Sequence, residues 1–261
     1  MYSTKHGNGE RLLVIVQGGD GDADASAALV DELTGDDTFT VLTYDRRGLS
    51  RSPVGEGPVT VESLTDDLAL LLAIQAKAPV DVLGVSIGAL IGLDLAARYP
   101  GLVRTLVAYE PPLTQVLDDP EPFVARQEAA EAAFAAGDMQ AAMRQFLELT
   151  GVDFEDREPD VAIPRPKPER GRNLAFFLTH DAPAARRFRL YLDPLLKDAP
   201  PAVVPALGTS SKGRPHGAPA EALARLLGRE PAEFQGGHNA HVLRPKAFAR
   251  KLRELLTAGY H

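Results

Sequence analysis

The stretch LGVSIGALIGLDLAARYP, residues 83–100, places a serine between two segments of different pattern. The apolar run Val80–Val85 is typical of a buried strand, and Ile87–Tyr99 has the apolar spacing of a helix. Residues 84–88, GVSIG, join them and fit the G-x-S-x-G turn, which exposes the serine hydroxyl between a strand and a helix. Glycine at the outer positions removes Cβ atoms that would collide with neighbouring backbone. We therefore expect Ser86 to be a nucleophile at the carboxyl edge of a sheet.

Further apolar runs of strand length alternate with helical patterns on both sides of this turn. The strand-like runs are 11–17 (RLLVIVQ), Thr38–Tyr44, Thr105–Tyr109, Ala202–Leu207 and Ala232–Gln235, and the helical segments are 24–34, Val61–Ala76, Ala218–Leu227 and Pro245–Ala258. This alternation predicts βαβ units, and so an α/β fold class with a mostly parallel sheet and helices on both faces.

The alternation stops at residue 112. Residues 121–150 are rich in Ala and Glu with a helical period, 158–168 contain four prolines and predict a loop, and 170–197 return to helical patterning. Because no strand-like run occurs there, we expect two units. A core domain would comprise residues 1–111 and 200–261, and a helical lid would comprise 112–199.

Composition excludes several classes of function. The 261 residues carry a formal net charge of −8, which argues against general nucleic-acid binding because phosphate contacts require clustered Lys and Arg. The chain has no cysteine, which excludes disulfides, cysteine-ligated zinc and a thiol nucleophile. It shows neither a signal-peptide apolar region nor a run long enough to span a membrane. We expect a cytoplasmic protein without a membrane partner, and the sequence leaves a homodimer open.

A serine nucleophile needs a base at neutral pH. His238 follows Gly236-Gly237 directly after the last strand-like run, and the two glycines allow the backbone to bring it close to Ser86. We therefore predict His238 as the base. His241, three residues further on, is the alternative.

Glu110 is the candidate for the carboxylate that orients the base. It ends the apolar Thr105–Tyr109 run, where a charge is costly unless it is paired. Adjacent parallel strands lie about 4.8 Å apart, so its side chain is able to reach a histidine beside Ser86. The alternative is a strand-end charge that accepts backbone N–H bonds. Two lid carboxylates, Asp181 and Asp193, are weaker candidates because they would have to cross the substrate cavity.

Four segments together resemble the α/β-hydrolase family. They are VQGGDG (16–21), YDRRGLSRS (44–52), the serine turn with its helix (83–100) and FQGGHNAHVLRPKAFARKLRELL (234–256). The resemblance implies an α/β-hydrolase core with a helical lid inserted after the family's sixth strand. It also implies an oxyanion hole from the backbone of Gly18 or Gly19 together with Ile87. Gln17 stands where the family often has histidine, and we expect it to brace the loop or contact substrate.

The chain departs from the family at the usual acid. Most members carry it as G-x-x-D after the strand that corresponds to Ala202–Leu207, whereas this chain reads GTSSK at 208–212. Some members take the acid from one strand earlier. The lactonases that open zearalenone look similar here, with a Glu followed by proline. The resemblance thus implies a Ser86–His238–Glu110 triad.

The expected reaction is hydrolysis of a small-molecule ester or lactone through an acyl-enzyme, with no metal or organic cofactor. The aromatic residues of the lid form either the wall of an apolar pocket or plain helix core: Phe176, Phe177, Phe188 and Tyr191. Two other classes of function stay open on the same fold. One is a non-catalytic ligand-binding protein, and the other is a natural-product cyclase or acyl-transfer enzyme.

Overall fold

The computed structural model describes residues 1–19, 21–163, 168–196 and 202–258. Its described part contains a seven-stranded sheet in the order β1-β3-β2-β4-β5-β6-β7. The strands are β1 (Ser3–His6), β2 (Arg11–Val16), β3 (Phe39–Tyr44), β4 (Val80–Val85), β5 (Val103–Tyr109), β6 (Ala202–Gly208) and β7 (Ala232–Phe234). Strand β1 pairs antiparallel with β3, and all other pairs are parallel. The predicted α/β fold class is confirmed.

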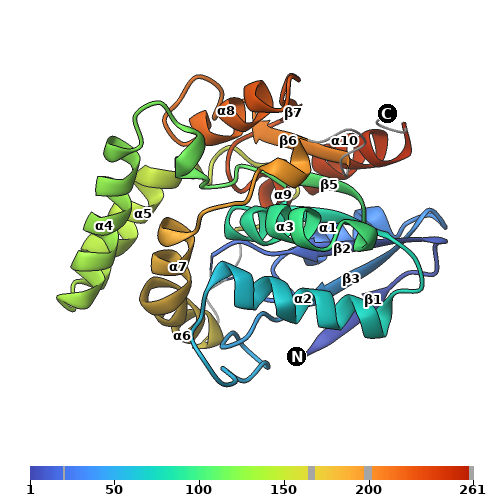
Figure 1. Cartoon of the computed structure of the whole chain (residues 1–261), viewed down its shortest axis with the longest axis horizontal. Coiled ribbons are helices and arrows are strands. Elements are labelled where there is room, and N and C mark those ends of the chain that lie inside the picture. The colour runs from blue at the N-terminus through green and yellow to red at the C-terminus, as the bar shows by residue number, and fades with distance from the viewer. Residues whose placement is uncertain (20, 164–167, 197–201, 259–261) are drawn as a thin grey trace.

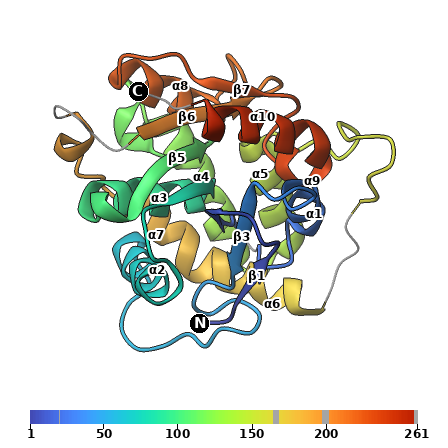
Figure 2. The same ribbon diagram turned by 90° about the vertical axis from the view of Figure 1, so that its right-hand side faces the viewer.

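Helices cover both faces of the sheet (Figures 1 and 2). On one face lie α2 (Val61–Gln75) and α3 (Ile87–Arg98), and on the other α1 (Ala27–Leu33), α9 (Ala240–Leu243) and α10 (Pro245–Thr257). The apolar side chains accordingly form two buried clusters, one on each side of the strands. Because β4 is buried along its whole length, it holds the residue that follows it in a fixed position.

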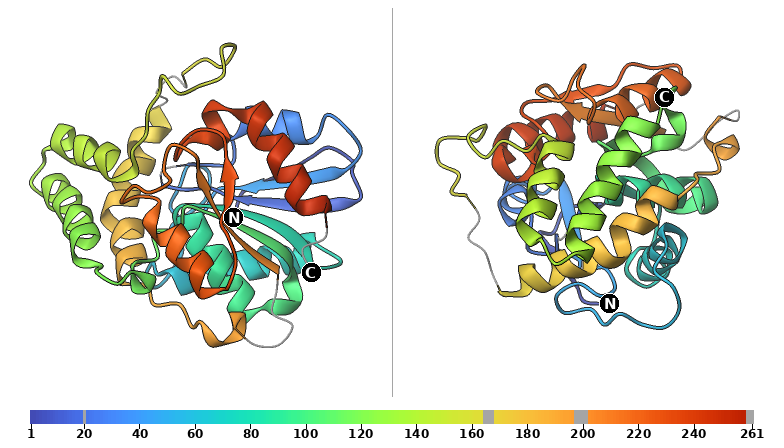
Figure 3. Two further views of the ribbon diagram at one scale, coloured as in Figure 1. Left: turned by 90° about the horizontal axis from the view of Figure 1, so that it is seen from above. Right: turned by 90° about the vertical axis from the view of Figure 1, so that its left-hand side faces the viewer.

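The segment predicted to be a lid, for which we keep that name, folds into several short helices that stand beside the core (Figure 3). They are η2 (Thr114–Val116), α4 (Glu121–Ala135), α5 (Met139–Thr150), α6 (Pro168–Phe176), η3 (Phe177–Asp181), α7 (Ala182–Arg187) and η4 (Asp193–Leu195). Helix α4 packs against α5 as an antiparallel pair. A break at Gly137-Asp138 separates them, with Gly137 at φ 83° and the Asp138 side chain capping α5.

The predicted helical segment 170–197 is shorter in the structure, and the predicted domain boundary lies outside the described residues. The helical pattern of 170–197 continues only to Arg187, because Phe188 takes extended backbone with ψ 140° and the chain runs on without helix to Leu192. The proposed boundary at 199/200 and the loop prolines Pro164 and Pro166 lie outside the described residues. The division into core and lid domains therefore stays a prediction.

Strand β1 is absent from the sequence-based expectations. Its residues, STKH, are polar, and it forms the antiparallel edge of the sheet, so it carries no apolar run. The strands in the interior of the sheet were predictable because both of their faces are buried.

None of the helices within the described ranges has the length and apolar character needed to cross a bilayer.

Candidate active site

The turn after β4 holds Ser86 in a strained conformation. Ser86 has φ 53° and ψ −120°, and it is the residue before the first turn of α3. A Cβ at Gly88 would lie 2.0 Å from the Val16 carbonyl oxygen, and one at Gly84 would lie 2.5 Å from the Gly88 carbonyl oxygen. Both glycines are therefore required by close backbone packing. As the first residue of α3, Ile87 has an N–H group without an acceptor inside the helix, which suits it to bind a developing oxyanion.

Glu110 occupies a second strained position, directly after β5. Its φ is 45°, and its backbone N–H donates to the Ala206 carbonyl of β6 at 2.8 Å. Ser50, Ser86 and Glu110 are the described residues other than glycine with positive φ. Strain of this kind costs of order 1–3 kcal/mol and clusters at functional sites. Two of the three strained residues are thus the predicted nucleophile and the predicted acid.

The structure brings Glu110 and His238 into direct contact. The Nδ1 atom of His238 lies 2.7 Å from Oε2 of Glu110, and the other carboxylate oxygen accepts a hydrogen bond from the Gly208 N–H at 2.9 Å. Glu110 is only 3% exposed and His238 only 9%. A contact through Nδ1 turns the opposite ring nitrogen, Nε2, away from the carboxylate and leaves it available to act as a base.

Burial by itself would raise the pKa of the Glu110 carboxyl. The hydrogen bond and charge of His238, together with Ser211 and the Gly208 amide, outweigh burial, and the pKa lies below its ordinary value. The Ser211 hydroxyl is buried without a hydrogen bond of regular geometry, yet it lies close enough to lower that pKa. Glu110 is therefore a carboxylate at neutral pH, as an orienting acid must be.

Ser211 stands at the fourth position of the segment 208–212, where the G-x-x-D pattern has its acid. Its side chain is fully buried beside Glu110. The usual acid position and the Glu110 carboxylate therefore meet at the same place, although they come from neighbouring strands.

The loop that carries His238 is anchored by β5 and β6. The Tyr109 hydroxyl donates to the Gly237 carbonyl at 2.6 Å, and the Ser210 N–H donates to the Gly236 carbonyl at 2.9 Å. Gly208 allows the two loops to approach, since a Cβ there would lie 2.3 Å from the Gly236 carbonyl oxygen. Tyr109 also packs edge-on against two aromatic rings of the core. The position of His238 is thus fixed from both neighbouring strand ends.

The loop after β2 approaches the serine through its first glycine. A Cβ at Gly18 would lie 3.1 Å from the Cβ of Ser86, so this position accepts a side chain only with difficulty. The Gln17 side chain is buried and exchanges hydrogen bonds with Ser26 at 2.9 and 3.1 Å. Of the two roles expected for Gln17, the geometry gives it the bracing one, because its amide is turned to Ser26 and not to the cavity.

A cavity lies between the serine turn and the lid. Ser86, Ile87, Glu110 and His238 line it on the core side. The lid wall is largely apolar and consists of Phe123, Gln127, Ala130, Glu131, Phe146, Leu149, Thr150, Phe177, Leu178, Ala182 and Ala185. A mainly apolar wall with a few polar groups is the usual form of a small-molecule site.

Of the four lid aromatics singled out from sequence, Phe177 lines the cavity and the other three do not. The Phe176 ring packs over Gly48 and beside His180, and Phe188 is buried in the core cluster. Tyr191 is 60% exposed. The other aromatic side chains of the wall are Phe123 and Phe146, which were not predicted from the sequence. Phe146 and Leu149 lie three residues apart on α5, and this spacing on one face was the available signal.

Two further histidines lie near the site. His241 is buried, its ring stands edge-on to Phe248, and burial together with the His238 charge lowers its pKa to about 3. It lies outside the cavity lining, so of the two candidate bases His238 is the one that lines the cavity. His216 lines the cavity, its ring packs on Gly151, and burial lowers its pKa. His216 lies in a Gly- and Pro-rich loop, where no sequence pattern marks it as a site residue.

Comparison with known proteins identifies relatives and solved structures that are hydrolases. The model of the alpha/beta hydrolase family matches residues 13–251. The "Uncharacterized hydrolase YraK" of Bacillus subtilis is 32% identical over 251 residues, which cover 94% of this chain and 88% of that protein. The enol-lactonase from Burkholderia xenovorans LB400 is 21% identical with a TM-score of 0.65, over 98% of this chain and 96% of that one. A thermophilic esterase from Thermogutta terrifontis is 20% identical with a TM-score of 0.65, over 98% and 93%.

Proposed function

Because this chain belongs to the alpha/beta hydrolase family, we propose that it hydrolyses a carboxylic ester or lactone through an acyl-enzyme on Ser86. One observation carries the proposal. The His238 ring contacts the Glu110 carboxylate at 2.7 Å and lines the same cavity as Ser86. A serine, a histidine and a buried carboxylate in one site are the groups that acyl transfer requires.

In the proposed mechanism the Ser86 hydroxyl attacks the ester carbonyl while Nε2 of His238 takes its proton. Glu110 holds the ring by Nδ1 and stabilises the imidazolium that forms. The N–H groups of Ile87 and of Gly18 or Gly19 bind the oxyanion of the tetrahedral intermediate. His238 then gives the proton to the leaving alcohol, and a water molecule activated by the same ring releases the acid and restores Ser86.

The apolar lid wall supports a substrate with an apolar acyl chain or ring. The comparisons include an enol-lactonase and an esterase by name, and both kinds of substrate present the same carbonyl to the serine. Our finer proposal is a lactonase of the zearalenone hydrolase type. It is supported by Glu110 followed by proline and by the lid of the 112–199 segment.

A fluorophosphonate probe tests the reaction class. The wild-type protein should be labelled on Ser86 and should hydrolyse p-nitrophenyl esters of graded chain length or macrocyclic lactones. The Ser86→Ala variant should lose labelling and about 10⁶-fold in kcat. A folded wild-type protein that takes no label would favour the ligand-binding alternative. Labelling together with product formation only in the presence of an acceptor alcohol or amine would favour acyl transfer.

A further inference from the structure

A buried ion pair joins the lid to the core beside the proposed oxyanion hole. Asp181, the last residue of η3, has a fully buried side chain whose Oδ2 lies 3.0 Å from Nη2 of Arg46. Arg46, in the turn after β3, is itself only 1% exposed. The sequence offered Asp181 as a weaker candidate for the catalytic acid, but the structure pairs it with Arg46 instead.

The same guanidinium clamps the loop after β2. Its Nη1 donates to the Gln17 carbonyl at 2.5 Å, and its Nη2 donates to the Gly19 carbonyl at 2.6 Å. These carbonyls belong to the peptide units on either side of the Gly18–Gly19 peptide. A trans peptide is planar with N–H opposite C=O, so holding the Gln17 carbonyl sets the direction of the Gly18 N–H.

The peptide between the two glycines is held as well. The Gly18 carbonyl accepts a hydrogen bond from the Gly21 N–H at 2.9 Å, which turns the Gly19 N–H the opposite way. Whichever of the two N–H groups meets the oxyanion, its orientation depends on carbonyls fixed in this loop. Arg46 binds the Gln17 carbonyl, which sets the Gly18 N–H, and the Gly19 carbonyl on the far side of the next peptide; Asp181 in turn holds Arg46.

The element that carries Asp181 also forms part of the substrate cavity. Phe177 and Leu178, in the same π-helical turn, line the cavity opposite Ser86. Turns of this kind are rare and frequently mark functional sites. A substrate that contacts Phe177 or Leu178 therefore contacts the same segment that holds Arg46 through Asp181.

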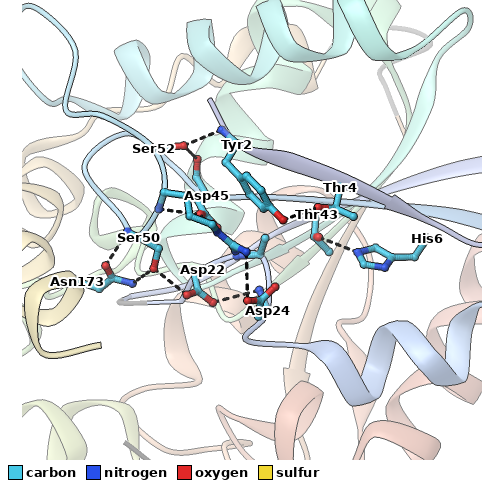
Figure 4. A network of polar contacts seen from close by, with 12 residues as sticks. Tyr2, Thr4, His6, Asp22, Asp24, Thr43, Asp45, Ser50, Ser52 and Asn173 are labelled. Atoms are coloured by element: carbon cyan, nitrogen blue, oxygen red, sulfur yellow. Dashed lines mark hydrogen bonds and ion pairs between the residues drawn. The ribbon is translucent and has the colours of Figure 1, made fainter. Parts of the chain in front are cut away.

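A second polar connection ties the lid to the same region (Figure 4). The Ser50 N–H donates to Oδ1 of Asn173 on α6 at 2.8 Å, and the Asn173 amide donates back to the Ser50 hydroxyl at 2.9 Å. The Ser50 hydroxyl donates in turn to Asp22, which follows the clamped loop, at 2.8 Å. The lid is thus seated on this loop at two points.

We propose that Asp181 is a positioning residue for the oxyanion hole. By holding Arg46 it holds the Gln17 carbonyl, and through that peptide the N–H group of Gly18, in the direction that the oxyanion requires. Seating of the lid is then a condition for turnover of every substrate, including those too short to touch the lid. This inference rests on the proposed ester or lactone hydrolysis.

The test is the Asp181→Asn variant with p-nitrophenyl acetate, whose acyl group is too short to contact the lid wall. We expect kcat to fall about 10- to 100-fold, less than the roughly 10²- to 10³-fold loss for a deleted oxyanion donor. KM should stay within about twofold, because the lost interaction acts in the transition state. The affinity for phenylboronic acid, whose serine adduct mimics the tetrahedral intermediate, should fall by the same factor as kcat.

Asp81→Asn is the matched control. Asp81 is fully buried on β4 and pairs with Arg11 at 2.8 Å and Arg104 at 3.0 Å, away from the cavity lining. It should leave kcat for the acetate ester unchanged. If Asp181→Asn lowered kcat no more than this control, or only raised KM for long-chain esters, the positioning role would be overturned.

A double variant covers the case in which Asp181→Asn fails to fold. Replacing a buried ion pair by apolar residues of similar volume is often neutral for stability, so Arg46→Met/Asp181→Leu should remain folded. It should lose kcat and boronate affinity at least as strongly as Asp181→Asn, and full turnover by this variant would contradict the inference. A wild-type protein that neither takes the fluorophosphonate label nor hydrolyses an ester would instead contradict the proposed function.

Discussion

Nδ1 of His238 lies 2.7 Å from Oε2 of Glu110, although the two residues are separated by 128 positions and Glu110 follows β5, not β6. The loop after β6 still takes part in this arrangement. The last residue of β6, Gly208, donates its N–H to the carboxylate, and the loop places Ser211 beside it. The proposed acid therefore follows β5, while the residues at the end of β6, where the family pattern would place it, contact its carboxylate.

Removing the charge of Glu110 should reduce turnover without unfolding the protein. In Glu110→Gln the amide still accepts the Gly208 N–H, but it no longer stabilises the imidazolium of His238. We expect kcat to fall by about 10³- to 10⁴-fold, as for other triad acids. Steady-state kinetics with circular dichroism as the control for folding measures the effect, and unchanged turnover would eliminate Glu110 as the acid.

Moving the carboxylate back to the loop after β6 should restore part of that activity. In Glu110→Gln/Ser211→Asp the new acid would start from the position that the G-x-x-D pattern uses. We expect kcat to recover about 10- to 100-fold relative to Glu110→Gln. His238 regains a charged partner, but the new carboxylate is not held in the orientation that Glu110 has. Ser211→Ala in the same background is the control. Equal activity of the two double variants would mean that position 211 does not reach His238.

Two glycines of α3 should respond differently to alanine. At Gly88 the new Cβ would meet the carbonyl of Val16, which is backbone and cannot move cheaply, so we expect a loss of about 3 kcal/mol in unfolding free energy. At Gly92 the nearest atom, at 2.6 Å, is the end of the Leu106 side chain. There the gain in helix propensity of about 1 kcal/mol should offset most of the crowding. Urea unfolding of both variants checks the contrast, and an equal loss would contradict it.

His241 should make stability depend on pH. Its pKa falls from 6.5 to about 3 on folding, because burial disfavours the charged ring. The unfolded chain thus binds more protons below pH 6.5, and this contribution to stability is present above 6.5 and lost progressively as the pH falls toward 3. His241→Leu should show a shallower decline between pH 6.5 and 4.5 in urea unfolding. A decline as steep as that of the wild type would assign the dependence to other groups.

Gln127 should discriminate among acyl groups. It lines the cavity from α4, and its Oε1 is buried without a partner among the described residues. An unsatisfied buried acceptor costs about 1–3 kcal/mol, so a substrate hydroxyl that reaches it should be favoured. We expect Gln127→Met to lower kcat/KM for an ω-hydroxyacyl ester about 10-fold relative to its unsubstituted counterpart. An unchanged ratio between the two esters would show that Gln127 makes no such contact.

The sequence predicted the core well because its strands are buried on both faces and each ends in a distinctive turn. The G-x-S-x-G turn located Ser86, and the paired glycines located His238. The cavity wall was harder to predict, because apolar residues on a helix serve a core or a pocket equally well. The Phe188 side chain is buried in the apolar core, whereas the Phe146 side chain lines the cavity. The link between Arg46 and Asp181 spans 135 positions and follows from no local pattern.

Two consecutive residues contact the His238 loop. The Tyr109 hydroxyl tethers the loop through the Gly237 carbonyl, and the Glu110 carboxylate contacts the His238 ring. In a regular strand, neighbouring side chains point to opposite faces. The left-handed backbone at Glu110 departs from that alternation, so that one strand end reaches the loop and the imidazole together. If residue 110 relaxed to extended backbone, the carboxylate would swing away while the tether stayed. The left-handed backbone at this one residue thus directs the carboxylate to the ring of the proposed base.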